Sequence, residues 1–458
     1  LRHNYLVILG KVIVQTLIIG REEFTVALGS ELQQVTLGLP LADAGVRIVD
    51  PDDYFSWMIV GNEDDLRRLM REIYYTLLRY DLRSVDEDVF RLLYEQVVDK
   101  DTRHRLGEFF TPKWLARFLI EKAVTDPDHR VLDPACGSGT FLVETIKHKG
   151  RLLQEMRGKI STDDLDRFID DVYGFDINPM AVFLARANIY LVLSRLAEDN
   201  GIGLPQEIKP RVYVADSLSW ERALHHRTIT GAKGIFVTMA SQVIPVPENL
   251  SSPEEALETG AGFGFAVSTY VEAIEEGSSH DKALRVALAE AAPSMRETFR
   301  QVLETLKAEL SAGDHIWGFV YRNKLIPIVS GRFDAVVGNP PWLVYRDMDP
   351  KFQEFADFVA DRNEIRPHPK VKTSFDLAVV FTLACRQYLD RESTLAFVLP
   401  ESVLTGLQHL PFLRKVTEES TGLWLEEAHD LRDVNPPPFP HGIACIASVF
   451  RNQGGEND

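Results

Sequence analysis

Short apolar strands alternate with helical segments along most of this chain, and the alternation limits the folds open to it. Each apolar run is followed by a stretch in which the apolar residues recur with helical spacing. Chains built in this way form α/β domains, in which a parallel sheet carries helices on both faces. The predicted strands are residues 130–133, 172–176, 211–216, 333–338 and 394–399.

Two other parts of the chain have helical patterns without strands. Residues 1–105 are mostly helical in pattern, so we predict a helical N-terminal domain there, followed by the α/β domain at 106–453. The third and fourth strands are separated by roughly 120 residues, too many for a simple loop. We predict that part of this segment, 245–313, is a helical insertion and that the tail, 454–458, is disordered.

Composition excludes several classes of protein. No apolar run reaches the roughly 20 residues that a membrane span needs, and the first residues lack the features of a signal peptide. Cys136, Cys385 and Cys445 lie far apart, in no zinc-binding spacing and no disulfide framework. We therefore expect a cytoplasmic protein with no membrane partner and no metal ion.

A glycine-rich turn follows the first predicted strand, at Asp133-Pro-Ala-Cys-Gly137-Ser-Gly139-Thr-Phe. Gly137 and Gly139 allow a tight turn and a close approach of the backbone to a ligand. Asp133 suits a cationic ammonium group, whereas a phosphate-binding loop would place a lysine here. No Gly-Lys-Ser/Thr follows, which excludes a nucleoside triphosphate site. The alternative is a strand-to-helix turn without a ligand.

Three successive strands end in an acid: Asp133, Asp176 and Asp216. Asp176 is placed to accept hydrogen bonds from both hydroxyls of a ribose, or else to complement a helix dipole. Asp216 is placed to accept one from an adenine amino group, or else to cap the following segment. Together, the three acids predict an adenosine site at the carboxyl edge of the sheet.

Asn339-Pro340-Pro341-Trp342 follows the fourth strand and is the most specific motif in the chain. An aromatic amine is a poor nucleophile, because its lone pair is delocalised into the ring. The Asn339 side-chain oxygen and the Pro340 carbonyl can accept hydrogen bonds from the N–H groups of this amine. They would thereby stabilise the charge that develops at its nitrogen. Pro341 would stiffen the loop and Trp342 would stack on a base that has been flipped out of a duplex. A rigid turn is the alternative.

The order of these motifs resembles a known family. Phe109-Phe-Thr-Pro112 precedes the Asp133–Phe141 turn, and Asn339–Trp342 comes last. This is similar to the gamma class of N6-adenine DNA methyltransferases from restriction–modification systems, above all to type I modification subunits and fused type IIG enzymes. The resemblance implies a Rossmann-like sheet that binds S-adenosyl-L-methionine and transfers its methyl group to adenine in DNA.

The resemblance also assigns roles to residues at the matching positions. The predicted cofactor-binding residues are Phe110, Thr111, Pro112, Asp133, Ala135, Cys136, Gly137, Asp176, Ile177, Asp216 and Ser217. Among them, Thr111 and Asp133 would hold the methionine part, Asp176 the ribose, and Ile177 and Asp216 the adenine. The catalytic set would be Asn339, Pro340, Pro341 and Trp342. Phe375-Asp376 would begin a helix beside the cofactor, and Phe439 would offer a second aromatic face to the base.

The implied partner is double-stranded DNA, although the net charge of −18 opposes binding to phosphates. The family reads its target through a recognition domain that follows the catalytic domain. We therefore expect that domain or subunit outside this chain, together with a nuclease or helicase of the same system. Residues 1–100 hold no nuclease-like cluster of acids and lysine. Two alternatives stay open: methylation of RNA or of a protein glutamine, and a DNA-bound scaffold in a phage-defence complex.

Overall fold

The computed structural model describes residues 2–18, 39–49, 63–79, 111–219, 236–239, 242–245, 253–289, 291, 293, 295–306, 316–418, 422–439 and 443–454. The chain divides into two compact units. The first consists of Leu1–Val212 together with Arg332–Asp458, and the second of Tyr213–Gly331. In the sequence, the second unit is inserted into the first. The boundaries predicted at 105, 245 and 313 stay predictions.

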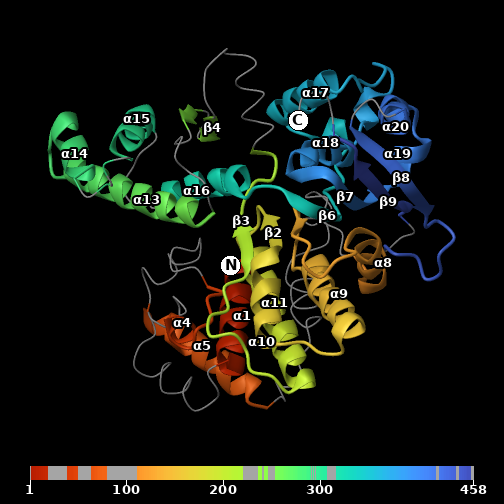
Figure 1. The fold of residues 1–458 in the computed structure, drawn as a ribbon. Coiled ribbons are helices and arrows are strands. Elements are labelled where there is room, and N and C mark those ends of the chain that lie inside the picture. Colours follow the sequence, from red (N-terminus) through yellow and green to blue (C-terminus); the bar gives the residue numbers. More distant parts are fainter. Residues whose placement is uncertain are drawn as a thin grey trace. The chain divides into compact units, whose positions relative to one another are not determined.

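A seven-stranded sheet, in the order β3-β2-β1-β6-β7-β9-β8, forms the framework of the fold (Figure 1). Its strands are β1 (Val131–Asp133), β2 (Val172–Asp176), β3 (Arg211–Val214), β6 (Phe333–Gly338), β7 (Leu389–Pro400), β8 (Leu423–Asp430) and β9 (Cys445–Asn452). The five strands predicted from the sequence are all present, and the ends of β1, β3 and β7 are shifted. The predicted α/β fold class is confirmed.

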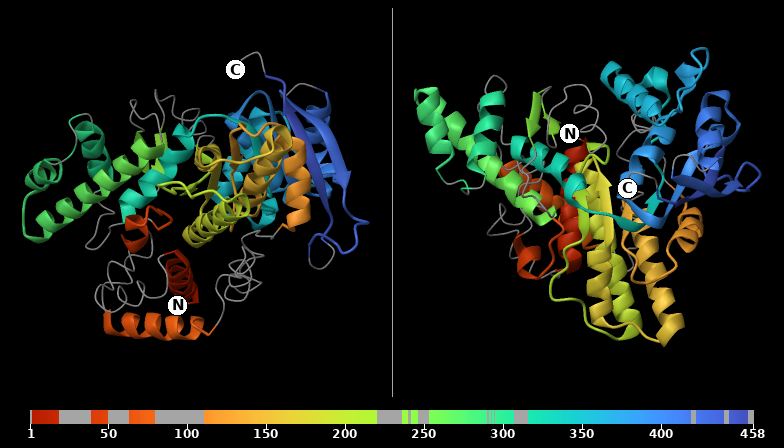
Figure 2. Two further views of the ribbon diagram at one scale, coloured as in Figure 1. Left: turned by 60° about the horizontal axis from the view of Figure 1, so that its bottom comes forward. Right: turned by 45° about the horizontal axis from the view of Figure 1, so that its top comes forward.

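One edge of the sheet departs from the prediction. The sequence predicted a parallel sheet, and β2, β1, β6 and β7 do pair in parallel. At the far edge, however, β9 is antiparallel to both β7 and β8, which Figure 2 shows as the dark blue strands. The prediction was wrong here because no helix lies between β8 and β9 among the described residues, so the strand–helix alternation on which it rested stops at β8. The sheet is mixed.

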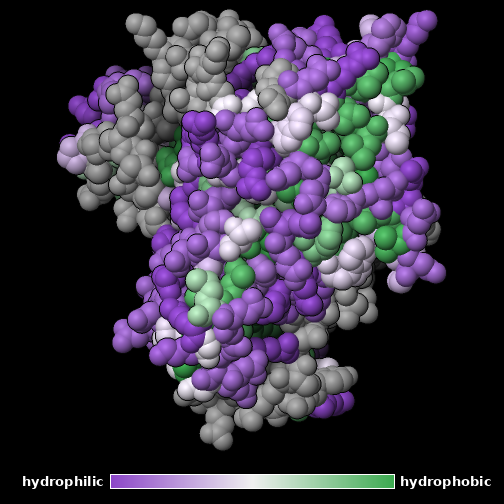
Figure 3. Space-filling view, turned by 45° about the vertical axis from the view of Figure 1, so that its right-hand side comes forward, coloured by the Kyte–Doolittle hydropathy of each residue, from purple (hydrophilic) through white to green (hydrophobic). Residues whose placement is uncertain are grey.

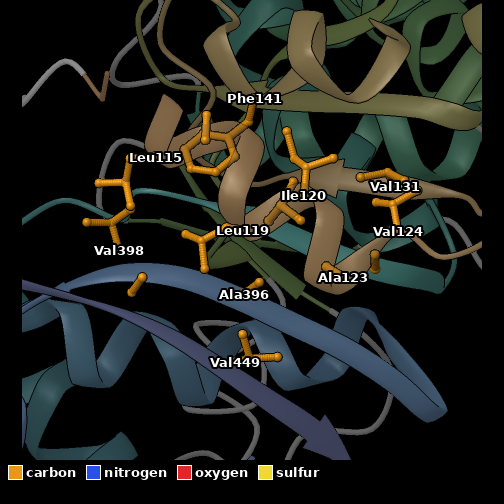
Figure 4. Packing of buried hydrophobic residues seen from close by; sticks show 14 of the residues in the cluster. Leu115, Leu119, Ile120, Ala123, Val124, Val131, Phe141, Ala396, Val398 and Val449 are labelled. Carbon is orange, nitrogen blue, oxygen red and sulfur yellow. The ribbon is translucent and has the colours of Figure 1, made fainter. Parts of the chain in front are cut away.

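Helices cover the sheet on the side that Figure 4 shows from close by. Leu115, Leu119 and Ile120 of α8 (Lys113–Ala123) share one core with Ala396 and Val398 of β7. Residues 393–399 of β7 are all buried, the pattern of a strand that is covered on both faces.

The remaining described elements of the first unit are helices and short 3₁₀ turns. They are α1 (Arg2–Ile18), α4 (Leu39–Asp43), α5 (Glu63–Leu77), α9 (Thr140–Arg157), α10 (Thr162–Asp171), α11 (Pro179–Asn200), η3 (Tyr345–Asp347), α17 (Pro350–Arg362), η4 (Lys372–Ser374), α18 (Leu377–Ala384), η5 (Cys385–Tyr388), α19 (Ser402–Thr405), η6 (Leu407–His409) and α20 (Leu410–Thr417). The N-terminal helix α1 packs on α11: Ile13 and Val14 share a cluster with Met180 and Phe183. The described helices of residues 1–105 thus continue the core of the α/β unit.

The start of α8 is set by Pro112. This residue occupies the capping position, with φ −59° and ψ 140°, and no side chain caps the helix. This extended backbone places the first helical residue at Lys113. The Pro112 carbonyl accepts hydrogen bonds from the N–H groups of Leu115 and Ala116.

In the second unit, the described residues form helices and one hairpin. They are β4 (Phe236–Met239), β5 (Gln242–Pro245), α13 (Pro253–Glu275), α14 (His280–Ala287), α15 (Arg296–Leu306) and α16 (Ile316–Val329). The helical pattern predicted for this segment is present. The antiparallel β4–β5 hairpin was not predicted.

Among the described residues, α11 is the one helix long and apolar enough to span a membrane, and 72% of its apolar window is buried. Its N-terminus is capped by Asn178, whose side chain accepts a hydrogen bond from the Met180 N–H, and Pro179 holds the first position. In the view of Figure 3 the described surface is mostly hydrophilic, with hydrophobic patches between. α11 is a core helix of its unit.

Candidate active site

The strand order reverses between β1 and β6, and such a switch point is where open α/β sheets bind ligands. Val131 pairs with Ala335 and Leu132 with Val336, so both strands end at the same edge. A Cβ atom added to Gly338 would lie 2.7 Å from Asp133 Oδ1. Asp133, the last residue of β1, therefore lies directly against the residue that precedes Asn339. Two of the predicted motifs meet here.

The turn after β1 has the conformation that its glycines predict. Gly137 and Gly139 have φ values of 51° and 90°, in the left-handed region. A Cβ on Gly139 would lie 3.0 Å from the Cβ of Ala185 in α11, whereas one on Gly137 would meet nothing within 4 Å. Gly139 is therefore required by packing. Gly137 leaves open space beside the turn.

Asp176, at the end of β2, connects the two turns. Its carboxylate accepts one hydrogen bond from the Gly137 N–H (2.9 Å) and one from the Asn178 N–H (2.8 Å). The side chain remains partly exposed. Because carboxylate oxygens each accept more than one hydrogen bond, Asp176 retains acceptor capacity for a ligand while it holds the glycine-rich turn.

Asp133 is only 1% exposed. Burial raises the pKa of its carboxyl well above the usual range, the Ala135 N–H at 3.1 Å opposes the rise, and the charge of Asp176 adds to it. Both effects that raise this pKa penalise the negative form of Asp133. A cation bound beside the two acids would relieve that penalty, since an opposite charge stabilises a carboxylate.

Ile177 follows Asp176 directly, and 73% of its surface is exposed. A large apolar side chain next to a ribose-type acid suits a planar, apolar ring such as adenine. Cys136, by contrast, is buried, and burial together with the charges of Asp176 and Asp133 raises its pKa. It packs within the turn as a neutral thiol. A cationic adenosine cofactor such as S-adenosyl-L-methionine fits the pair of neighbouring acids, the open space beside Gly137 and the exposed side chain of Ile177.

The Asn339–Trp342 loop leaves β6 and is fixed on its far side by the start of α18. The N–H of Leu377 donates to the carbonyl of Leu343, and the N–H of Tyr345 donates to the carbonyl of Phe375, both at 2.8 Å. Pro340 is buried, whereas Asn339 and Trp342 are partly exposed. The prediction that a helix begins at Phe375-Asp376 is confirmed: the Asp376 side chain caps α18.

A buried histidine supports the same junction. The N–H of Asp376 donates to His409 Nε2 (3.0 Å), and His409 Nδ1 lies 2.9 Å from the carbonyl of Ser402. Since Nε2 accepts, Nδ1 carries the proton and the ring is neutral. Burial lowers the pKa of His409, and the hydrogen bond to the Ser402 carbonyl opposes this shift. Burial raises the pKa of Asp376 to about 7, and the hydrogen bond from the Ala378 N–H opposes that shift. Both side chains are held in an apolar environment.

Trp342 packs edge-on against Phe439, with ring centroids 5.1 Å apart and an interplanar angle of 76°. Phe439 is 1% exposed and belongs to the core cluster of α8 and β7. The sequence suggested Phe439 as a second aromatic face for the base. In the structure it supports Trp342 from the core.

The other predicted residues are divided among different parts of the chain. Thr111 and Ala135 lie in the first unit, Thr111 buried and Ala135 partly exposed, while Phe110 lies outside the described residues. Asp216 and Ser217 belong to the second unit. There Asp216 accepts a hydrogen bond from the Leu218 N–H (3.1 Å) and pairs with Lys324 Nζ (2.6 Å). This is the capping role that the sequence left open, and its role toward an adenine stays a prediction.

Sequence reasoning missed three residues of the site: Gly338, Tyr345 and His409. Gly338 stands next to the Asn-Pro-Pro-Trp motif, so its position was a usable signal. His409 lies more than thirty residues beyond Asp376, and no spacing rule joins the two.

Two family models match the chain. One, described as N-6 DNA methylase, matches residues 85–203. The other, described as Eco57I restriction-modification methylase, matches residues 170–422, more than half of the chain. The chain belongs to the Eco57I restriction-modification methylase family. The resemblance to adenine-N6 DNA methylases, inferred from the three motifs, is confirmed.

Curated relatives of this methylase chain are similar over part of their length. The methylase subunit of the type I restriction enzyme EcoEI from Escherichia coli is 27% identical over 144 residues, 31% of this chain and 26% of that protein. The adenine-specific methyltransferase BrxX from Escherichia coli O9:H4 (strain HS) is 22% identical over 313 residues, 57% of this chain and 24% of that protein. The chain thus spans about a quarter of the length of these relatives.

Among solved structures, a chain of the DrdV–DNA complex resembles this one with a TM-score of 0.49 and 14% identity. The match covers 97% of this chain and 36% of that chain.

Proposed function

We propose that this chain is a site-specific DNA adenine-N6 methyltransferase that uses S-adenosyl-L-methionine and acts in the cytoplasm within a restriction–modification or phage-defence system. The observation that carries the proposal is the contact between its two motifs. Asp133 of the glycine-rich turn touches Gly338, and Asn339 follows at once. A cationic methyl donor and an aromatic amine would therefore be held at adjacent strand ends.

The cofactor would be held at the carboxyl ends of β1 and β2, together with Thr111. Asp133 and Thr111 would bind its methionine part, Asp176 its ribose hydroxyls, and Ile177 its adenine ring. When bound, S-adenosyl-L-methionine supplies the electrophilic methyl group. Asp216 and Ser217 are proposed to contact the cofactor adenine.

The chain's own part in the reaction lies in the Asn339–Trp342 loop. Asn339 Oδ1 and the Pro340 carbonyl would accept hydrogen bonds from the two N–H groups of the target amine. They would stabilise the positive charge that develops on its nitrogen. Trp342 would stack on the flipped adenine, with Phe439 behind it as a support. The anchoring of Leu343 and Tyr345 to α18 would keep these acceptors fixed before the base arrives.

Sequence recognition is proposed to lie in a further domain or subunit, with a nuclease or helicase of the same system as another partner. Two alternatives are methylation of RNA or of a protein glutamine, and a DNA-bound scaffold without turnover. Family membership favours DNA adenine over both.

Transfer of tritiated methyl from S-adenosyl-L-methionine separates these functions. Plasmid DNA, bulk RNA and a whole-protein extract are offered in parallel to the chain supplemented with its partners. We expect label in DNA, at the adenine amino group after digestion to nucleosides. Label in RNA or protein alone would support those substrates. Cofactor binding without label in any of the three would support the alternative of a DNA-bound scaffold without turnover.

A further inference from the structure

A basic loop follows α17, at residues 366–372 (Arg-Pro-His-Pro-Lys-Val-Lys). The chain as a whole carries a net charge of −18, yet residues 362–372 hold four arginines and lysines and one acid. Charge of this sign, concentrated in one short loop of an acidic chain, is the footprint expected of a phosphate contact.

The backbone of the basic loop is held in place. Ile365 is fully buried, and its N–H donates to the carbonyl of Ala360 at 2.8 Å. Pro367 is also buried, and the Val371 N–H donates to the carbonyl of His368 at 2.9 Å. Between these anchors the side chains of Arg366, His368 and Lys370 are exposed. Cations on a fixed backbone lose less entropy on binding than cations on a flexible one.

Nearby acids are already neutralised. Glu364 pairs with Lys415 (2.5 Å), and Asp361 pairs with Arg366 (2.5 Å). Lys370 forms no ion pair within the part of the chain that the structure describes. Exposed ion pairs contribute little stability, so Arg366 can exchange its carboxylate for a phosphate at small cost.

The basic loop is joined to the segment that leaves the Asn339–Trp342 loop. Lys372 Nζ lies 4.4 Å from the centre of the Tyr345 ring, and both side chains bond to Asp357, at 2.7 Å and 3.1 Å. Tyr345 comes three residues after Trp342. A flipped nucleotide remains bonded to a phosphate on either side, so the DNA backbone must pass close to the pocket that holds its base.

We propose that the basic loop binds phosphates of the DNA duplex next to the flipped nucleotide, through Arg366 and Lys370, with Lys372 as the link to the catalytic loop. This inference rests on the proposed function, because it is that function which brings a duplex to the Asn339–Trp342 loop. The contact is independent of base sequence. It supplies positive charge that the chain as a whole lacks.

The test is a titration of a fluorescein-labelled duplex of arbitrary sequence with the 458-residue chain, followed by anisotropy at several NaCl concentrations. Arg366→Ala/Lys370→Ala is compared with Lys282→Ala/Arg285→Ala, which removes the same charge from exposed positions of α14. A third variant, Arg366→Lys/Lys370→Arg, keeps the charge of the loop.

We expect the loop variant to bind about tenfold or more weakly at low salt. The slope of log affinity against log salt should fall by about 0.9 for each phosphate that the variant no longer binds. The α14 variant and the charge-conserving variant should keep the wild-type slope. A loop variant with the wild-type slope, an α14 variant that weakens as much, or a wild type with no salt-dependent DNA binding would overturn the inference. Tritium transfer by the wild type is scored separately, so a wild type that shows the salt effect but transfers no methyl group to DNA refutes the proposed function and leaves the phosphate contact of the basic loop standing.

Discussion

The candidate site has two halves that are built in opposite ways. The acid half, Asp133, Gly137, Asp176 and Ile177, places two carboxylates close enough for one to raise the pKa of the other. The loop half, Asn339–Trp342 with its supports, is held by backbone hydrogen bonds, a neutral histidine and an aromatic edge. The acid half thus concentrates negative charge, while the loop half is close to neutral.

This difference matches two different tasks. Concentrated negative charge attracts a sulfonium or ammonium group. An amine that must become a nucleophile needs fixed neutral acceptors in an apolar setting, where each hydrogen bond is stronger than in water. The two halves meet where Gly338 lies against Asp133. Substitutions in either half should therefore be separable by what they disturb.

Asn339→Ala should produce the largest effect and confine it to the loop half. We expect methyl transfer to fall by about 100- to 1000-fold, the loss typical of one stabilising contact in the transition state. Cofactor affinity measured by calorimetry should be unchanged. Asn200→Ala, at the end of α11, serves as the control and should keep full activity. Equal transfer by the Asn339 variant and the wild type would remove Asn339 from the reaction.

Asp176→Ala should disturb the acid half alone. Hydrogen bonds to a charged group contribute about 1.5–3 kcal/mol, so the cofactor should bind roughly 10- to 100-fold more weakly. The same change removes the acceptor for Gly137 and Asn178. Transfer at saturating cofactor should stay close to wild type. Asp199→Ala, an exposed acid of α11, is the matched control. Calorimetry that finds the same affinity in both variants would argue against a ribose contact.

Gly338→Ala should join the two effects, because its Cβ would lie 2.7 Å from Asp133 Oδ1. Overpacking of this kind costs about 1–3 kcal/mol, so cofactor affinity and transfer should both fall by about tenfold. Gly203→Ala is the control, since nothing lies within 4 Å of the added atom there. If only one of the two quantities falls, the halves do not meet at Gly338.

Asp376→Asn tests whether the loop half prefers to be neutral. The pKa of Asp376 in the fold is about 7, above its usual value of 3.8. The folded state therefore holds this proton more tightly than the unfolded state. The contribution of this proton to the free energy of unfolding is present in full below about pH 4. It is lost as the pH rises to about 7, by roughly 1.4 kcal/mol per pH unit at most.

Asparagine keeps an acceptor for the Ala378 N–H and carries no charge. The free energy of unfolding of Asp376→Asn, followed by urea between about pH 4 and pH 7, should lack this decline. Asp349→Asn removes an exposed carboxylate that caps α17 and should follow the wild type. If the Asp376→Asn variant shows the same decline with pH as the wild type, the decline does not come from Asp376, and the raised pKa of its carboxyl is contradicted.

The sequence predicts much of the fold and of the acid half, because both depend on local patterns. Buried strands, a helix opened by Asn178-Pro179 and glycines at a tight turn are each visible within a short stretch of sequence. The loop half depends on pairings between distant segments: Leu343 with Leu377, Asp376 with His409, and Trp342 with Phe439. No local rule predicts these pairings. The antiparallel edge, β8 and β9, escaped prediction for another reason: no described helix separates these two strands, so the strand–helix alternation that predicts parallel pairing is missing there.

Asp216 shows the limit of an argument from position. It does follow β3, and the sequence allowed either a contact to adenine or a cap. A cation more than a hundred residues away, Lys324, pairs with its carboxylate. An ion pair of that sequence separation cannot be read from the spacing of strand-end acids.

The proposed role of the Asn339–Trp342 loop in methylating adenine is tested most directly on DNA from living cells. Single-molecule sequencing and nucleoside mass spectrometry would compare host cells that carry the wild-type gene at its native locus with cells that carry Asn339→Ala. We predict N6-methyladenine at a defined sequence context with the wild type and its loss with the variant. Unmodified adenine in the wild-type cells, or the same methylation in both, would contradict the account.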